Sequence, residues 1–167
     1  SHGFHDGTMS KHVFVGPRLS LTAANADEWL NVPAGSEAMV ALAMAQVVAS
    51  KHGHALAGSL SAYAPEKVAK ATGLTAQQLT ALGEAFAAAS PSLAVAGGVA
   101  AQHRGAIELC HAVNLLNEAA GNIGTTVGFG AAPAAAAGYG DVLALFESMR
   151  AGRVHVLLVH EANPLYA

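Results

Sequence analysis

Cysteine and charged residues are scarce in this chain of 167 residues. Its one cysteine, Cys110, excludes an internal disulfide and a metal site built from this chain's cysteines alone. Charged side chains make up 11% of the sequence and the formal net charge is −3, so no basic patch is available for phosphate backbones or anionic lipid. We therefore expect no nucleic-acid partner.

Long hydrophobic runs are also missing. The most continuous apolar stretch, residues 38–49, is interrupted by Gln46 and is shorter than the roughly 20 residues that span a bilayer. Residues 1–7 have neither the charged nor the apolar region of a secretory signal. We expect no transmembrane segment, and we expect residues 1–12 to be a disordered or vector-derived tail.

Apolar side chains, in contrast, are abundant. They make up 53% of the sequence, which is more than a small free-standing domain normally needs to fill its core. We therefore expect part of the surface to face a partner, either another polypeptide or a second copy of the chain.

The pattern of apolar residues predicts strands that alternate with helices. The helix beginning at Ser36 is apolar nearly all round, so it should be buried on several sides, and Ser36 is expected to cap it with its hydroxyl. Cys110 lies on the predicted apolar stripe of a later helix, with Ile107 and Val113, and is expected to be buried there. The predicted strands are residues 13–15, 93–96 and 154–159, and the predicted helices are residues 36–50, 65–72, 75–86, 104–120 and 141–151.

This order predicts an α/β fold, because parallel neighbouring strands need helical crossovers. We expect a three-layer, Rossmann-like fragment with a short parallel sheet flanked by helices. One α/β segment should cover residues 13–167, and an internal boundary could fall near residues 53–62. Three strands are few for a sheet covered on both faces, so an open edge or a missing remainder follows.

No complete catalytic motif is present, and we assign no catalytic residue. The chain contains neither a G-x-G-x-x-G fingerprint nor a phosphate-binding G-x-x-x-x-G-K-[ST] loop. The pair His52 and His54 lacks a nearby third ligand, so we expect no metal site. In open α/β sheets ligands bind beyond the carboxyl ends of strands, which directs attention to residues 16–22, 97–104 and 160–163, although ordinary loop chemistry explains their polarity equally well.

Several segments, taken in order, resemble the central α/β domains of molybdopterin oxidoreductases. Residues 17–30 followed by 34–38 are similar to that family's D-P-R…A-D…P-G-T-D-x-A stretch, and residues 63–66 with 72–75 are similar to its Y-x-P-E…T-G-V segment. Residues 97–105 and 114–124 look like its Q-H-x-x-G…G-N-I-G block. Residues 152–164 look like its closing strand and N-P.

The resemblance implies strand-end loops that clasp a molybdopterin guanine dinucleotide. Carried over residue by residue, it assigns the cofactor-binding positions to Gly16, Arg18, Ser36, Glu37, Gln102, His103 and Asn163. Gly16 stands where the family has an acid, and a lost carboxylate removes a charge-assisted acceptor for nucleotide donors. We therefore expect no cofactor in this chain, and the family's iron–sulfur cysteines have no counterpart here.

The sequence of residues 18–29 most resembles the quinol-linked branch of the family, such as the alternative complex III large subunit. The resemblance implies a structural segment of an electron-transfer subunit, inactive by itself, whose partners are the remaining domains of a longer polypeptide and an iron–sulfur subunit or domain. It also implies a periplasmic or membrane-associated bacterial parent. Two alternatives stay open: the dinucleotide-binding part of an active molybdenum oxidoreductase, and a free-standing α/β nucleotide-binding module.

Overall fold

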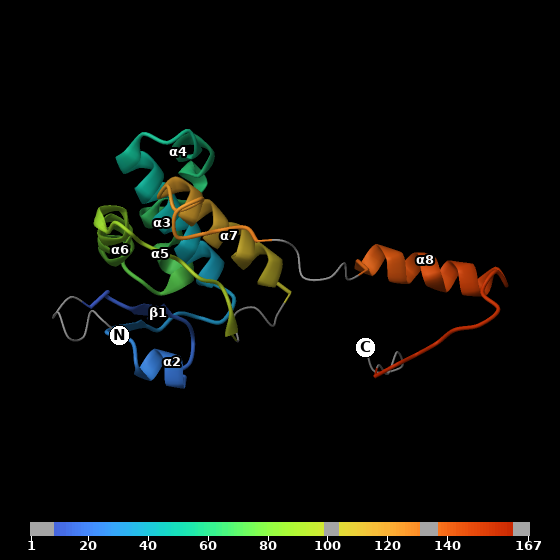
Figure 1. Cartoon of the computed structure of the whole chain (residues 1–167). Coiled ribbons are helices and arrows are strands. Elements are labelled where there is room, and N and C mark those ends of the chain that lie inside the picture. Colours follow the sequence, from blue (N-terminus) through green and yellow to red (C-terminus); the bar gives the residue numbers. More distant parts are fainter. Residues whose placement is uncertain (1–8, 99–103, 131–136, 162–167) are drawn as a thin grey trace. The chain divides into compact units, whose positions relative to one another are not determined.

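The computed structural model describes residues 9–98, 104–130 and 137–161. Two short parallel strands, β1 (Val13–Val15) and β2 (Glu28–Leu30), form its sheet, with Val13 opposite Glu28 and Val15 opposite Leu30. The helix α2 (Leu21–Ala24) lies in the crossover between them. Figure 1 shows α2 on one side of the strands and the larger helices on the other. The α/β prediction, with a short parallel sheet flanked by helices, is therefore confirmed.

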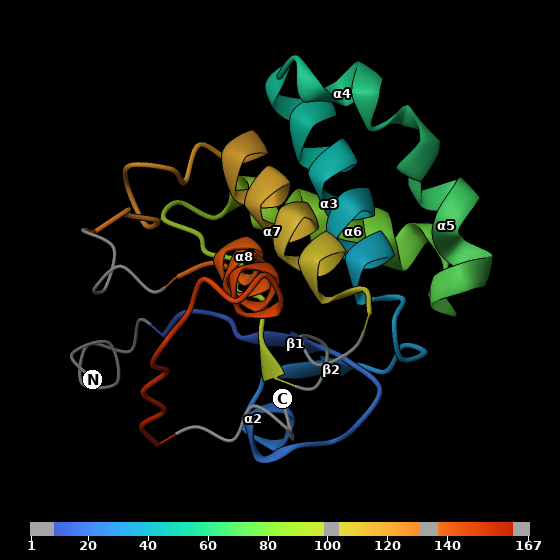
Figure 2. The ribbon, with the colours of Figure 1, turned by 90° about the vertical axis from the view of Figure 1, so that its right-hand side faces the viewer.

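The longest helix, α3 (Glu37–His52), is the centre of the core. Val40, Ala43, Ala45, Val48 and Ala49 along it are almost completely buried. It packs against α5 (Pro65–Thr72), α6 (Ala76–Ala88) and α7 (Ala106–Ala119), which surround it in Figures 1 and 2. The short turns α4 (Leu56–Ser59) and η1 (Ser61–Tyr63) connect α3 to α5. The prediction that α3 is buried on several sides is confirmed.

Local signals place the helix ends well. Pro65 is the first residue of α5, where its missing N–H costs nothing. Thr75 and Gln78 form a reciprocal capping box at the start of α6. The last helix, α8 (Tyr139–Arg150), has Asp141 in its first turn, and that carboxylate accepts the Gly138 N–H at 2.8 Å.

Two of the three predicted strands are wrong within the described residues. Neither residues 93–96 nor residues 154–159 are in a strand, and the chain bends at His155. A strand needs a hydrogen-bonded neighbour, and no backbone partner is present for residues 154–159. The second strand of the sheet is instead β2, which the sequence analysis missed although Trp29 favours a strand.

The buried face of α7 also differs from the predicted stripe. Leu109, Ala112, Val113 and Leu116 face the core, whereas Ile107 and Cys110 are exposed. The prediction that Cys110 is a buried hydrophobe is therefore wrong. The predicted stripe took every third residue, and such a stripe winds around a helix that has 3.6 residues per turn. Its amino-terminal members, Ile107 and Cys110, therefore lie off the buried face of α7.

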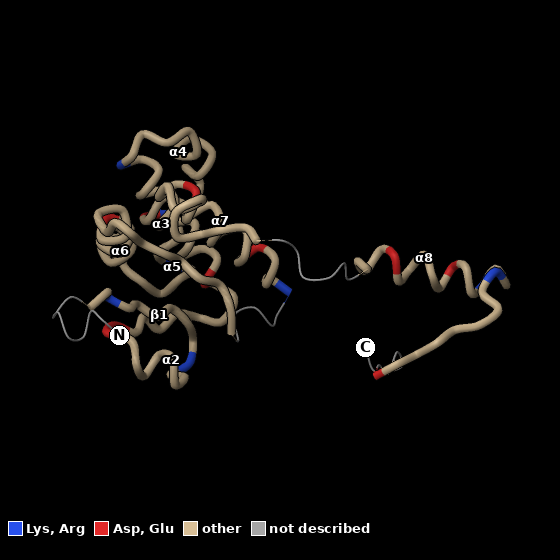
Figure 3. The backbone as a smooth tube through the Cα atoms, in the orientation of Figure 1, with Lys and Arg blue, Asp and Glu red and all other residues tan. Residues whose placement is uncertain are grey.

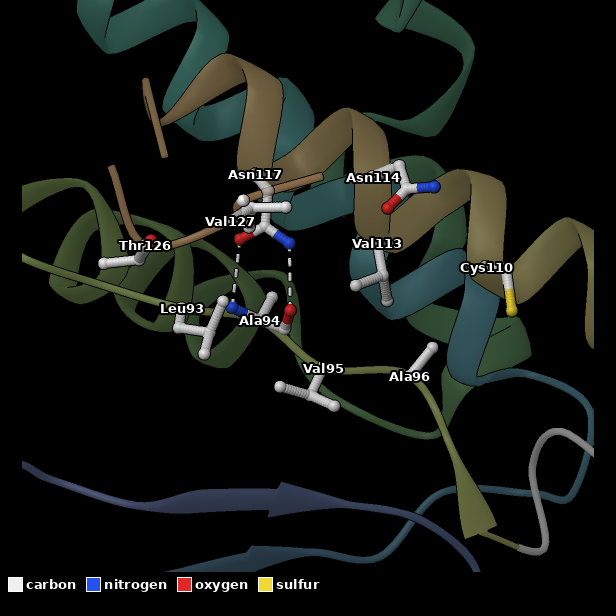
Figure 4. Close-up of a pocket in the computed structure, with 11 residues that line it drawn as sticks. Leu93, Ala94, Val95, Ala96, Cys110, Val113, Asn114, Asn117, Thr126 and Val127 are labelled. Carbon is white, nitrogen blue, oxygen red and sulfur yellow. Dashed lines mark hydrogen bonds between the residues drawn. The ribbon is translucent and has the colours of Figure 1, made fainter. Parts of the chain in front are cut away.

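A buried amide network fastens residues 92–96 to α7. The Ala94 N–H donates to Asn117 Oδ1 at 3.0 Å, and Asn117 Nδ2 donates to the Ala94 carbonyl at 2.9 Å. Both bonds are drawn in Figure 4. Asn117 Oδ1 also accepts from Asn122 Nδ2 at 3.1 Å, and Asn122 in turn bonds the Ser92 hydroxyl. The Asn117 side chain thus bonds both backbone polar groups of Ala94, as a neighbouring strand would.

The loop after α7 closes on the same network. The Asn122 carbonyl accepts from the N–H groups of Thr125, Thr126 and Val127. The Thr126 hydroxyl donates to the Ser92 carbonyl at 2.7 Å. Residues 92–94 are therefore held from α7 and from the following loop at once.

The structure separates into two compact units, residues 1–129 and residues 130–167. The second unit contains α8 and residues 154–159, and no residue of α8 is buried.

In the first unit, Lys11 pairs with Glu28 at 2.6 Å and the His12 N–H donates to Asp27 at 2.7 Å. The limits expected for the tail and for an internal boundary near residues 53–62 stay predictions.

Most charged side chains lie at the surface, and Glu37 is the buried exception among the described residues. Figure 3 shows acidic and basic residues scattered along the described chain without a block of either kind. The ion pairs of the described residues are exposed, as in the Arg150–Glu147 pair at 3.2 Å. Such pairs contribute little to stability, so the fold depends on the apolar core and the amide network.

We expect Gly83→Ala to destabilise the protein by about 1–3 kcal/mol, because overpacked cores must shift or strain. A Cβ at Gly83 would lie 2.8 Å from Val47 Cβ, where α6 crosses α3. Gly58→Ala is the matched control, since a Cβ at Gly58 meets nothing within 4 Å. Urea unfolding of both variants tests this, and equal midpoints would contradict the close helix contact.

We expect Asn117→Ala to cost about 2–3 kcal/mol, because both polar groups of Ala94 lose a partner in a half-buried place. Asn114→Ala, on an exposed position of the same helix, should change stability by less than about 0.5 kcal/mol. The free energy of unfolding from urea titrations measures both. A cost for Asn117→Ala no larger than that of Asn114→Ala would refute the role of the network.

Candidate functional site

The carboxyl ends of β1 and β2 lie at one edge of the sheet, since the strands are parallel. Gly16 and Arg18 follow β1, and the turn with Ser36 and Glu37 follows β2. The Gly16 N–H donates to the Leu30 carbonyl at 3.1 Å, which joins the two strand ends directly. Four of the predicted cofactor-binding residues therefore come from the two loops that leave this edge.

Both backbone polar groups of Gly16, its N–H and its carbonyl, are hydrogen-bonded. Its carbonyl accepts the indole N–H of Trp29 at 3.0 Å, and the residue is buried. A Cβ added here would lie 3.0 Å from Cε1 of the Phe14 ring. The position therefore suits glycine, and any side chain would have to displace an aromatic ring.

Arg18 is exposed, and its guanidinium has no partner among the described residues. It is the one cation among the four described candidates, and its five N–H donors suit a phosphate or a carboxylate. Its exposure leaves those donors hydrated.

Ser36 and Glu37 form a closed turn with the residues before them. The Ser36 hydroxyl donates to the Pro33 carbonyl at 2.7 Å, and the Glu37 carboxylate accepts the Gly35 N–H at 2.7 Å. Both side chains are 6% exposed. Ser36 precedes α3 as predicted, but its side chain does not cap the helix, so that prediction is wrong. The hydroxyl acts as a donor to the loop and is turned away from the N–H groups of the first turn.

The remaining candidates, Gln102, His103 and Asn163, lie outside the described residues. The chain that leads to the first two can be followed as far as Gly98. In Figures 1 and 2 it passes beside the β1–β2 pair after leaving the amide network. Gly98 has φ +64°, a left-handed conformation that glycine adopts without strain.

A shallow pocket of about 460 Å³ lies between residues 93–96, α7 and the loop after it. Val113, Leu93 and Val127 give it apolar walls, and Asn114 and Asn117 add amides. Cys110 also lines it, at the exposed position described above (Figure 4). The Asn117 amide is occupied by Ala94, so few polar groups remain for a ligand.

A second hollow of about 550 Å³ lies between α3, α5 and α6. Lys51, Glu66 and Glu84 line it together with Gln46, whose amide donates to the Ser50 hydroxyl at 3.0 Å. Its charged residues are exposed, as on an ordinary hydrated helix surface.

The two histidines of the His52–His54 pair bond backbone groups. His52 Nδ1 lies 3.2 Å from the Ala119 carbonyl at the end of α7, and His54 Nδ1 accepts the Leu56 N–H at 3.3 Å. The described residues contain no group of three histidine, cysteine or acidic side chains that could hold a metal ion. None of the helices described is both long and apolar enough to cross a membrane.

The sequence analysis missed Asn117 and Asn122. Asn117 lies four residues after Val113 on the buried face of α7, where an apolar residue is expected. A buried amide at such a position must find hydrogen-bond partners. The polar interruption of the helical pattern was the available signal, but it does not say which segment supplies the partner.

Comparison with known proteins finds relatives by sequence and by structure, while no protein-family model matches the chain. Over 188 aligned residues that include the whole chain, 31% are identical to the menaquinone reductase, molybdopterin-binding-like subunit of Nitratidesulfovibrio vulgaris. The fold matches acetylene hydratase from Pelobacter acetylenicus over 72% of this chain, with a TM-score of 0.60 and 22% identity.

The chain spans 27% of the length of the menaquinone reductase subunit and 18% of the acetylene hydratase chain. The sequence match runs over the same order of segments that resembled the family, and the solved structure supplies the same fold. The predicted resemblance to the molybdopterin oxidoreductase family is therefore confirmed.

Proposed function

We propose that this chain is a structural segment of a molybdopterin-oxidoreductase-like electron-transfer subunit and that it holds no pterin guanine dinucleotide. The observation that carries the proposal is the closed turn before α3. There the residue Glu37 is 6% exposed and its Oε2 accepts the Gly35 N–H. That bond uses one of the two carboxylate oxygens for the loop itself, so the acid has less capacity left for the donors of a guanine ring.

The state of Gly16 supports the same proposal. The family's acid is replaced by a residue without a side chain, and the Phe14 ring occupies part of the space that a side chain would need. With Gly16 bare and Glu37 Oε2 bonded to Gly35, the two strand-end loops offer guanine donors a single carboxylate oxygen without an internal bond, Glu37 Oε1. A guanine donor left unpaired on binding would be costly where water is excluded.

The relative suggests what the parent protein does. Its name describes a menaquinone reductase subunit that is molybdopterin-binding-like. We propose that the parent of this chain likewise belongs to a complex that exchanges electrons with a quinone, and that this segment contributes scaffold. Because the chain spans 27% of that relative, we propose that the remaining domains of a longer polypeptide and an iron–sulfur subunit or domain are its partners.

The second candidate is the dinucleotide-binding part of an active molybdenum enzyme. The exposed and unpartnered Arg18 beside the sheet edge favours it, because a free guanidinium suits the phosphates of a dinucleotide. In that case the nucleotide's donors would bond Glu37 Oε1, or Glu37 Oε2 after release of the Gly35 N–H.

We expect the purified full-length protein to contain far less than one molybdenum and one pterin per polypeptide. Elemental analysis and pterin fluorescence after acid oxidation measure the two contents. Stoichiometric amounts of both would overturn the cofactor-free part of the proposal and favour the active enzyme. Titration of the chain with guanosine monophosphate and diphosphate should likewise give no saturable heat.

We expect Glu37→Ala to cost about 1–2 kcal/mol of stability, because the Gly35 N–H loses a charged acceptor. Glu66→Ala is the matched control: it removes an exposed acid from the first turn of α5, where only the helix dipole is lost, about 0.3–1 kcal/mol. Urea unfolding with and without guanosine diphosphate measures both. A nucleotide that stabilises the wild type but not Glu37→Ala would show that Glu37 binds ligand.

A further inference from the structure

We draw no further inference here: the strongest candidate, the shallow apolar hollow between residues 93–96 and α7, has its buried amide, Asn117, already bonded to Ala94, and nothing among the described residues shows what covers it.

Discussion

The arrangement of the first unit depends on one buried amide. Asn117 holds the backbone of Ala94 from both its N–H and its carbonyl, and the same side chain accepts from Asn122. In this way residues 92–96 stay extended although no strand pairs with them. The cost of burying the amide is offset because every polar atom in the network has a partner. The path of the chain toward Gly97 and Gly98, and so toward the predicted nucleotide loop, follows from that clamp.

Local chemistry made much of this fold predictable. Pro65, the Thr75 capping box and the glycines after helices act within a few residues of themselves, and their helices lie where the sequence placed them. Strands depend on neighbours far along the chain, and here prediction failed. Residues 93–96 and 154–159 have the composition of buried strands, yet a side chain replaces the partner of the first and no described residue pairs with the second. The three residues of β2 were too few to stand out.

In the candidate site, too, the positions of residues along the chain were easier to predict than their contacts. The order of the loops, together with the family resemblance, predicted cofactor-binding roles for Gly16, Arg18, Ser36 and Glu37, and these roles stay predictions. The structure places the first two after β1 and the last two at the start of α3, which follows β2. Which way each side chain turns could not be read from residue type. Ser36 was expected to cap α3 and instead donates to Pro33. Its backbone is helical (φ −93°, ψ −2°), whereas a capping residue has an extended backbone that brings its oxygen to the N–H groups of the first turn. Asn117 and Asn122 were missed because their partners lie up to 30 residues away in sequence.

A loop built to hold a nucleotide carries polar groups that need partners when the nucleotide is absent. In this chain those groups satisfy one another: Glu37 takes the Gly35 N–H, Ser36 takes the Pro33 carbonyl, and Gly16 joins Leu30 and Trp29. Each such bond stabilises the loop without ligand and uses part of the hydrogen-bonding capacity of its atoms, although an oxygen acceptor can take a further bond. A bond that has to be given up on binding lowers the affinity by the free energy with which it stabilises the empty loop. Such internal bonds therefore favour a segment whose role is structural, because they raise its stability. They disfavour a segment that must bind a cofactor, because they lower its affinity.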